Sequence, residues 1–243
     1  MNKVGAREGR RTQDMRWMEA ALAEAARGLG RVSPNPAVGC VLVRGGREVG
    51  RGFHRRFGGP HAEVEALKAA GPRARGATAY VTLEPCRHEG KTGPCTEALI
   101  AAGVARVVAG VRDPNPAVAG KGLDYLRRRG VEAVVGPMRQ QCSELIRGFR
   151  SWVTTGLPYV HLKLAASLDG RIAARGGASK WISGAASRRR VQEMRLRADA
   201  VLVGAGTVVA DDPRLTCRLG PPTGPLRVVL DPHLATPPGA RLL

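Results

Sequence analysis

Four residues with the chemistry of a hydrolytic metal site follow one another in the first half of the chain: His61, Glu63, Cys86 and Cys95. One imidazole and two thiolates supply three ligands, which leaves the fourth tetrahedral position of a zinc ion to water, as in catalytic zinc sites. Glu63 is placed to take the proton of that water. A Glu that acts as acid and base without binding the metal is typical of zinc nucleobase deaminases. The residues therefore predict hydrolytic deamination.

The elements around these residues must bring them to one point. Positions i and i+2 of a regular helix point about 200° apart. His61 and Glu63 can therefore meet one metal only in a first helical turn, and a helix over residues 61–70 is predicted, ended by Gly71-Pro72. A short β-rich stretch at residues 79–83 would deliver Cys86, and Pro94 would precede a helix that Cys95 opens.

Other interpretations apply to the same residue types. Cys40, Cys142 and Cys217 are interpreted as small apolar core residues. Eight residues separate Cys86 from Cys95, whereas the deaminase signature has two between its cysteines. The alternative to an enzyme is a non-catalytic module stabilised by zinc, and Glu63 argues against it because a structural site does not need a proton shuttle.

The long spacing carries a family resemblance. Residues 82–95 (TLEPCRHEGKTGPC) resemble the pyrimidine deaminase domain of the bifunctional RibD family of riboflavin biosynthesis enzymes. The resemblance extends to residues 33–39 (SPNPAVG), 61–67 (HAEVEAL) and 113–116 (DPNP). The chain departs from the family at Arg87, where Ser is usual, and at Gly93-Pro94, where Pro-Pro is usual; neither position is a metal ligand.

The resemblance implies a cytidine-deaminase-like three-layer α/β/α domain that binds Zn²⁺. Its reaction would convert 2,5-diamino-6-(5-phosphoribosylamino)pyrimidin-4-one into 5-amino-6-(5-phosphoribosylamino)uracil and ammonia. By similarity, Asn35 would hydrogen-bond the pyrimidine, His54 would position it, and Lys91 would meet its phosphate. Taken alone, Asn35 before Pro36 is also typical of a turn, and Lys91 of a solvated loop.

A second unit begins after the turn residues at 155–158. Residues 159–170, 179–182 and 201–213 resemble the amino-terminal part of the family's NADPH-dependent reductase domain, which has a dihydrofolate-reductase-like α/β fold. The resemblance implies cofactor contacts at Ala165, Trp181, Thr207 and Asp211. It implies substrate contacts at Ser179, Arg195, Leu215 and Arg218, although a position such as Leu215 is equally typical of a core.

The predicted organisation is a disordered basic extension (1–14), a deaminase domain (15–150) and an incomplete reductase domain (158–243). Family members continue through further strands after the apparent strand at 226–230, so we expect this chain to deaminate but not to reduce. The remaining elements predicted by periodicity alternate between helix and strand. They are helices 15–27, 95–102, 121–129 and 139–150, and strands 37–43, 48–53 (paired as a hairpin), 77–83, 106–111 and 131–135.

Composition limits the partners. The net charge is +19, which attracts nucleic acid or only a phosphorylated substrate, but aromatic residues form 4% of the chain and no RNA-binding signature is present. A tRNA adenosine deaminase is the alternative enzyme, disfavoured by the cysteine spacing. Five cysteines without a disulfide pattern and no apolar segment of membrane-spanning length predict a cytoplasmic protein without a membrane partner. Homo-oligomer formation is left open.

Overall fold

The computed structural model describes residues 3–87, 93–116, 118–219 and 224–243. The chain forms two compact units, Met1–Tyr159 and Val160–Leu243. The division falls close to the turn residues from which the sequence predicted a boundary.

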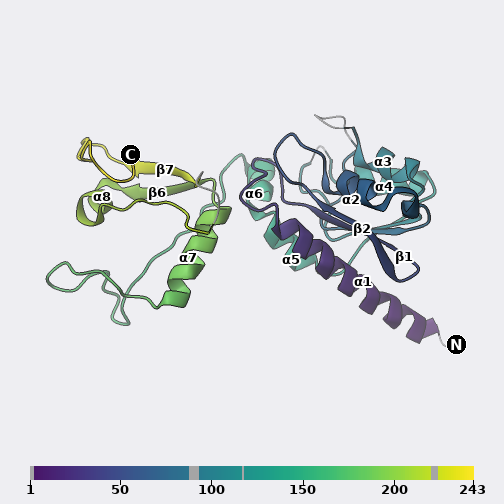
Figure 1. The fold of residues 1–243 in the computed structure, drawn as a ribbon, viewed down its shortest axis with the longest axis horizontal. Helices are drawn as coiled ribbons and strands as arrows, with labels where there is room; N and C mark the ends of the chain where they lie inside the picture. Colours follow the sequence, from purple (N-terminus) through teal and green to yellow (C-terminus); the bar gives the residue numbers. More distant parts are fainter. Residues whose placement is uncertain (1–2, 88–92, 117, 220–223) are drawn as a thin grey trace. The chain divides into compact units, whose positions relative to one another are not determined.

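The first unit contains a five-stranded mixed sheet (Figure 1). Strands β1 (Gly39–Arg44) and β2 (Arg47–Phe53) form the predicted hairpin, and β1 also pairs antiparallel with β3 (Thr78–Val81). β4 (Arg106–Ala109) and β5 (Glu132–Val135) extend the sheet with parallel pairing, in the order β2-β1-β3-β4-β5. The parallel part places the ends of β3 and β4 at one edge, where the loops after them meet.

Helices cover both faces of this sheet (Figure 1). Successive side chains of a strand point to opposite faces, so Leu42 and Val81 join one apolar cluster while Val41 and Tyr80 join another. The first cluster includes side chains of α2 (Ala62–Ala70), α3 (Cys95–Ala101) and α4 (Lys121–Arg128), and the second includes those of α1 (Lys3–Ala26) and α5 (Arg139–Leu145). The predicted three-layer α/β/α domain is confirmed. A short 3₁₀ helix, Gly71–Ala74, follows α2.

Glycines let the helices approach the hairpin closely. A Cβ added at Gly52 would lie 2.5 Å from the backbone nitrogen of Ala66, and one at Gly50 would lie 2.5 Å from the Ala66 carbonyl oxygen. On the other face, a Cβ at Gly39 would lie 2.2 Å from the carbonyl oxygen of Ala21 in α1. Such separations are well inside van der Waals contact, so these positions fix how deeply α1 and α2 sit on the sheet.

The disordered extension predicted for residues 1–14 is wrong from Lys3 onward, because α1 begins there instead of at Met15. Asp14 is 8% exposed and accepts hydrogen bonds from Tyr80 Oη (2.8 Å) and Arg106 Nη1 (2.7 Å). Arg10 forms a further ion pair with Glu132 at 3.3 Å. These tertiary contacts hold the polar part of α1 against β3, β4 and β5. The sequence of α1 alone gives no indication of them.

The single helix predicted over 139–150 is two helices, α5 (Arg139–Leu145) and α6 (Arg147–Thr155). Ile146 separates them with backbone angles φ −106° and ψ 15°, outside the helical range. Its side chain is 2% exposed, so burial of Ile146 accompanies the break.

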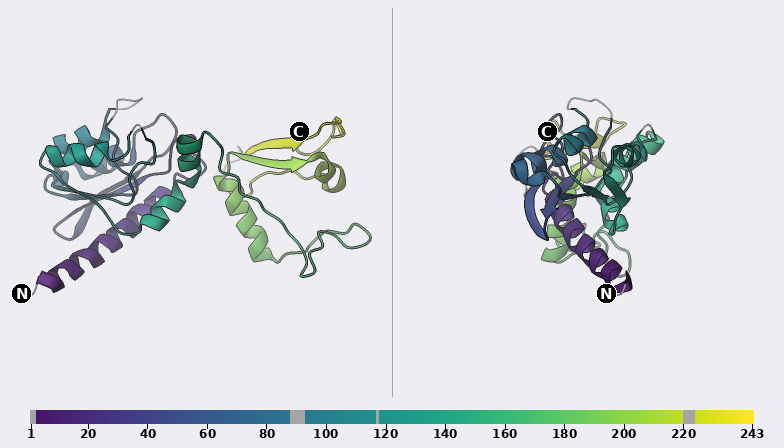
Figure 2. Two further views of the ribbon diagram at one scale, coloured as in Figure 1. Left: turned by 180° about the vertical axis from the view of Figure 1, so that it is seen from behind. Right: turned by 90° about the vertical axis from the view of Figure 1, so that its right-hand side faces the viewer.

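The second unit contains α7 (Ala185–Arg197), β6 (Ala200–Gly204), α8 (Ala205–Asp211) and β7 (Leu226–Leu230), as Figures 1 and 2 show. β6 and β7 pair in parallel, and β7 matches the strand predicted at 226–230. A small apolar cluster of Val208, Ala240 and Leu242 packs beneath them. In neither unit does a described helix combine the length and apolar composition that crossing a bilayer requires.

Candidate zinc site and active-site pocket

The three predicted metal ligands come together. His61 Nδ1 lies 3.2 Å from Cys95 Sγ and 3.5 Å from Cys86 Sγ, and the three ligand atoms are all within 4.8 Å of one another. A tetrahedral zinc ion with ordinary Zn–N and Zn–S bonds separates such atoms by about 3.5–4 Å. The donor set and its spacing therefore fit zinc.

Each ligand is delivered by the end of an element. His61 is the N-cap of α2, with extended backbone angles (φ −74°, ψ 164°), so it precedes the helix instead of opening it as predicted. This extended residue lets the imidazole turn to the side on which Glu63 points. Cys86 follows β3, and Cys95 is the first residue of α3.

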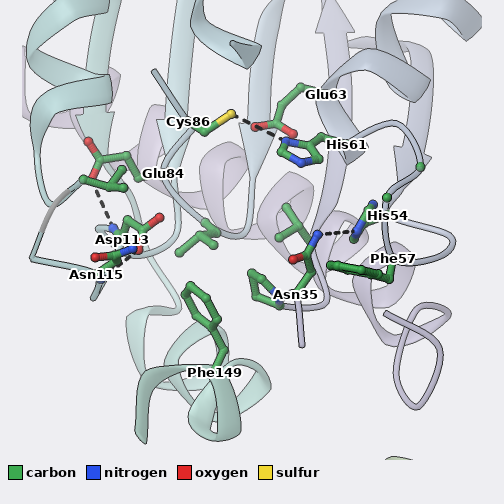
Figure 3. A pocket seen from close by; sticks show the side chains of 16 residues that line it. Asn35, His54, Phe57, His61, Glu63, Glu84, Cys86, Asp113, Asn115 and Phe149 are labelled. Carbon is green, nitrogen blue, oxygen red and sulfur yellow. Dashed lines mark hydrogen bonds between the residues drawn. The ribbon is translucent and has the colours of Figure 1, made fainter. Parts of the chain in front are cut away.

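Glu63 lies beside the ligands and is 3% exposed. Figure 3 shows its carboxylate next to His61 and Cys86 in the pocket. Burial is the main reason that the pKa of Glu63 rises to about 7, and the negative charge of Cys86 adds to it. A carboxyl group with a pKa near neutrality both accepts and donates a proton readily, as general acid–base catalysis requires.

The two cysteines differ in their environments. A hydrogen bond from Cys95, with a further contribution from His61, lowers the pKa of Cys86 to about 4. The Cys95 amide also lies 3.4 Å from Cys86 Sγ and donates to it. Of the two cysteines, Cys86 is therefore the one on which the thiolate form is favoured.

Asn35 and His54 form a hydrogen-bonded pair at the pocket wall (Figure 3). His54 Nδ1 lies 2.9 Å from the Pro60 carbonyl oxygen, which can only accept, so Nδ1 carries the proton. Nε2 is then an acceptor for Asn35 Nδ2 at 3.1 Å. Burial lowers the pKa of His54, in agreement with a neutral ring. Because the side-chain nitrogen of Asn35 donates to His54, the side-chain oxygen Oδ1 of Asn35 is the group that can accept a hydrogen bond from a ligand.

A pocket of about 270 Å³ opens in front of these groups, and its lining includes Asn35, His54, His61, Glu63 and Cys86. Sequence reasoning assigned no role to several other residues that line it: Phe57, Glu84, Asp113, Asn115 and Phe149. The motifs containing Glu84, Asp113 and Asn115 supported the family resemblance. Glu84 follows the strand predicted at residues 77–83, and a charged residue at that place is a signal that could have singled it out. Phe57 and Phe149 carried no such signal.

Lys91 lies outside the described residues, so its predicted contact with a phosphate stays a prediction. Its neighbour Arg87, which departs from the family pattern, lies over the ring of Tyr125 in α4 with its guanidinium carbon 4.7 Å from the ring centre. Cys40 and Cys142 are buried as predicted, whereas Cys217 is only half-buried, with its Sγ 3.5 Å from the Gln192 carbonyl oxygen.

In the second unit, some predicted residues lie together. Ser179 Oγ lies 3.5 Å from Asp211 Oδ1, and Arg195 Nη1 donates to the carbonyl oxygen of Thr216 at 3.1 Å, next to Leu215. Burial and the charge of Arg218 lower the pKa of Arg195.

The other predicted contacts of this unit range from buried to exposed. Leu215 is 5% exposed and Trp181 is 69% exposed, with Arg188 over its ring. Thr207 lies in α8 and Ala165 in the irregular segment before α7. Their assignment to a cofactor or substrate stays a prediction.

Comparison with known families supports both units. Residues 11–111 match the cytidine and deoxycytidylate deaminase zinc-binding region, and residues 158–243 match the RibD C-terminal domain. These matches confirm the fold classes predicted for the two units.

Curated relatives and solved structures agree. The chain is 54% identical to the riboflavin biosynthesis protein RibD of Escherichia coli over 85% of its length, and 47% identical to that of Aquifex aeolicus over 95%. It spans 56% and 65% of the lengths of these two relatives. It is 48% identical to Acinetobacter baumannii RibD, with a TM-score of 0.88. That match covers 96% of this chain and 67% of the Acinetobacter baumannii chain.

A structure from Thermotoga maritima, described as a diaminohydroxyphosphoribosylaminopyrimidine deaminase/5-amino-6-(5-phosphoribosylamino)uracil reductase, is 46% identical with a TM-score of 0.90. It too is matched over 96% of this chain and 67% of its own. Because sequence and fold agree over nearly all of its length, the chain belongs to the RibD family of riboflavin biosynthesis proteins.

Proposed function

We propose that the first unit catalyses the zinc-dependent hydrolytic deamination of 2,5-diamino-6-(5-phosphoribosylamino)pyrimidin-4-one to 5-amino-6-(5-phosphoribosylamino)uracil. The observation that carries this proposal is the buried Glu63 beside a cluster of one His and two Cys, at the wall of a pocket of about 270 Å³. The activity by which the Thermotoga maritima relative is described supports the choice of substrate.

The roles of the residues follow from their positions. Zinc, held by His61, Cys86 and Cys95, would lower the pKa of water so that hydroxide is available at neutral pH. A Glu63 carboxylate oxygen accepts the proton of the attacking water and passes it to a ring nitrogen of the pyrimidine. It then takes the proton of the hydroxyl group on the tetrahedral carbon and gives it to the amine, which leaves as ammonia while the carbonyl forms. The Asn35 carbonyl oxygen, oriented by His54, holds the pyrimidine by one of its N–H groups.

The phosphate would be met by Lys91, an assignment that rests on the family resemblance. The excess of basic residues adds a long-range attraction for an anionic substrate. The relatives found give no support to a tRNA adenosine deaminase.

We propose that the second unit contributes to an NADPH-dependent reductase, because it matches the RibD C-terminal domain. Ala165, Trp181, Thr207 and Asp211 would contact NADPH. Ser179, Arg195, Leu215 and Arg218 would contact the ribosyl phosphate. Titration of the protein with NADPH, followed by fluorescence, tests this assignment, and the absence of saturable binding would contradict it.

The five free cysteines fit a reducing compartment, and a cytoplasmic location is part of the proposal.

The deaminase proposal is tested by ammonia release from the diaminopyrimidine ribosyl phosphate. The purified protein should release ammonia with about one zinc ion bound per chain, lose activity on treatment with a chelator, and regain it with added zinc. The same pyrimidine without its phosphate and a tRNA serve as comparison substrates. Faster ammonia release from the tRNA would overturn the proposal.

A further inference from the structure

Glu84 is a buried carboxylate in the wall of the pocket, 3% exposed. Each of its oxygens accepts two hydrogen bonds from backbone N–H groups. Oε1 accepts from Gly122 (3.0 Å) and Leu123 (2.9 Å) in the first turn of α4. Oε2 accepts from Asp113 (3.0 Å) and Gly120 (2.9 Å). Four charge-assisted bonds of this kind hold the backbone more firmly than neutral ones do.

These bonds close a loop on a single side chain. The amides of Asp113 and Gly120 are both bound by Oε2, so the segment between them begins and ends at one atom. The backbone of Glu84 takes part as well, because its N–H donates to the Val111 carbonyl oxygen at 2.9 Å. Glu84 thus joins the chain after β3 to the chain after β4 and to the start of α4.

The closed segment faces the pocket. Asp113 and Asn115 line it on the side away from Asn35 and His54 (Figure 3). Their mutual position is set locally, since the Asn115 N–H donates to Asp113 Oδ1 at 2.8 Å. The placement of this pair relative to the rest of the pocket depends on the anchor at Glu84.

The same anchor reaches the metal ligands. Glu84 is separated from Cys86 only by Pro85, and α4 lies directly on this peptide, because a Cβ added at Gly122 would meet the Pro85 carbonyl oxygen at 2.1 Å. One carboxylate therefore connects a metal-ligand segment with the loop that forms the opposite wall of the pocket.

We propose that Glu84 is a positioning residue of the deamination site. It holds Asp113, and with it Asn115, at a fixed distance from Cys86, so that both side chains meet the substrate while its pyrimidine ring lies at Glu63. The role requires a group that only accepts hydrogen bonds, because all four partners are N–H donors. The inference rests on the proposed deaminase function.

Glu84→Gln tests the proposal with almost no change of volume. The amide nitrogen of Gln would face two of the four N–H donors and cannot accept their hydrogen bonds. The two hydrogen bonds to the remaining oxygen would be kept. Gly122→Ala disturbs the same contact and leaves Glu84 in place. Asp14→Asn is the matched control, since Asp14 is also a buried carboxylate that accepts hydrogen bonds but does not line the pocket.

Zinc content, unfolding temperature, KM and kcat are measured for the whole chain, together with hydrogen exchange of peptides that contain Asp113 and Gly120–Leu123. Glu84→Gln and Gly122→Ala should bind zinc as the unchanged protein does. Their KM should rise at least about tenfold with a smaller fall in kcat, as expected when a loop that binds substrate is misplaced. The anchored amides should exchange faster. Asp14→Asn should unfold at a lower temperature with KM unchanged.

A Glu84→Gln protein with an unchanged KM and only a lower unfolding temperature would overturn the proposal, since Glu84 would then be a structural cap. Loss of zinc from both pocket variants would also overturn it, because the anchor would then serve the metal alone. If the unchanged protein releases no ammonia, the deaminase function fails. Hydrogen exchange still decides about the anchor in that case, and unaltered protection of these amides in Glu84→Gln would reject it.

Discussion

Glu63 is buried at the pocket wall beside the metal ligands without being one of them. Glu63→Gln should therefore keep zinc and the fold while deamination falls about a hundred- to ten-thousandfold, the usual contribution of a positioned proton shuttle. Metal analysis and ammonia release on the same preparation measure both properties. Activity close to that of the unchanged protein would contradict the assigned role.

Cys86→Ser and Cys95→Ser provide the contrast to that variant. Each removes a ligand, so zinc should be lost along with activity. Either Ser variant binding zinc at full stoichiometry would show that the cluster is not the metal site.

The hydrogen bond between Asn35 and His54 leads to a prediction about the pKa of His54. Asn35→Asp replaces the donor that faces His54 Nε2 with an acceptor, while Nδ1 still donates to Pro60. The ring must then donate from both nitrogens, so the pKa of His54 should rise and kcat/KM should fall about ten- to hundredfold. Nitrogen NMR of His54 measures the titration. An unchanged pKa would contradict the proton assignment.

The residues that touch the metal were predictable because their types and order specify the chemistry. Glu84 was not assigned a role, although it stands in the same motif. Its partners are backbone N–H groups 29 to 39 residues later in the chain, about which side-chain patterns say nothing. Lone residues such as Phe149 enter the pocket through the fold of α6, and no local pattern indicates that.

At the scale of elements, α2 must lie close to β2 for Glu63 to reach the ligands. Gly52→Ala would place a Cβ 2.5 Å from Ala66 N and 2.7 Å from the Ala62 carbonyl oxygen, so α2 has to move. The free energy of unfolding should fall by about 1–3 kcal/mol, as for other overpacked contacts, and zinc should bind more weakly. Chemical unfolding and zinc titration measure the two effects.

Gly9→Ala is the control for that variant. Gly9 lies in α1 with open space where its Cβ would be, so alanine should stabilise the helix by about 0.5–1 kcal/mol. A Gly52→Ala protein that behaves like Gly9→Ala would contradict the close packing of α2 on β2.

The contact between α1 and the sheet depends on pH. Burial alone would raise the pKa of Asp14, but hydrogen bonds from Arg106 and Tyr80 outweigh it and leave the pKa lowered. A carboxyl group with a depressed folded-state pKa stabilises the protein above its unfolded pKa and loses that contribution as pH falls through the folded value. Below about pH 4 the unfolding free energy should therefore fall more steeply in the unchanged protein than in Asp14→Asn. The unfolding free energies are measured in urea over a series of pH values. If they fell equally steeply with pH in the two proteins, this coupling would be contradicted.

The order of strands and helices could be predicted because apolar runs and turn residues alternate regularly through residues 37–135. The start of α1 could not. Arg106 lies far from Asp14 in the sequence, and the bonds between them become visible only once the sheet has formed. The break between α5 and α6 similarly depends on the burial of Ile146.

At the scale of the whole molecule, the two units differ in how much they bury. The first has two apolar clusters, one on each face of its sheet, whereas the described cluster of the second is Val208, Ala240 and Leu242 with a few neighbours. Large side chains of the second unit such as Leu162, Leu164 and Ile172 are exposed. Because buried apolar area is the main source of stability, the second unit should unfold first.

Scanning calorimetry should accordingly show two transitions, with the lower one assigned to residues 160–243 by limited proteolysis. Zinc should raise the temperature of the upper transition only, since its ligands all belong to the first unit. A single transition that shifts as a whole with zinc would contradict this independence. The unequal burial of the two units was not predictable from the sequence.

The glycines on which α1 and α2 lie also set how this protein tolerates sequence change. At Gly39 and Gly52 even one added methyl group meets backbone atoms at 2.2 Å and 2.5 Å, and backbone, unlike a side chain, has no rotamer to which it can retreat. In a library of random variants selected for activity, these positions should return glycine alone, while Gly9 and Gly176, with nothing within 4 Å, accept many residues. Mutational freedom should thus be as narrow at these glycines, which perform no chemistry, as at the residues of the proposed active site.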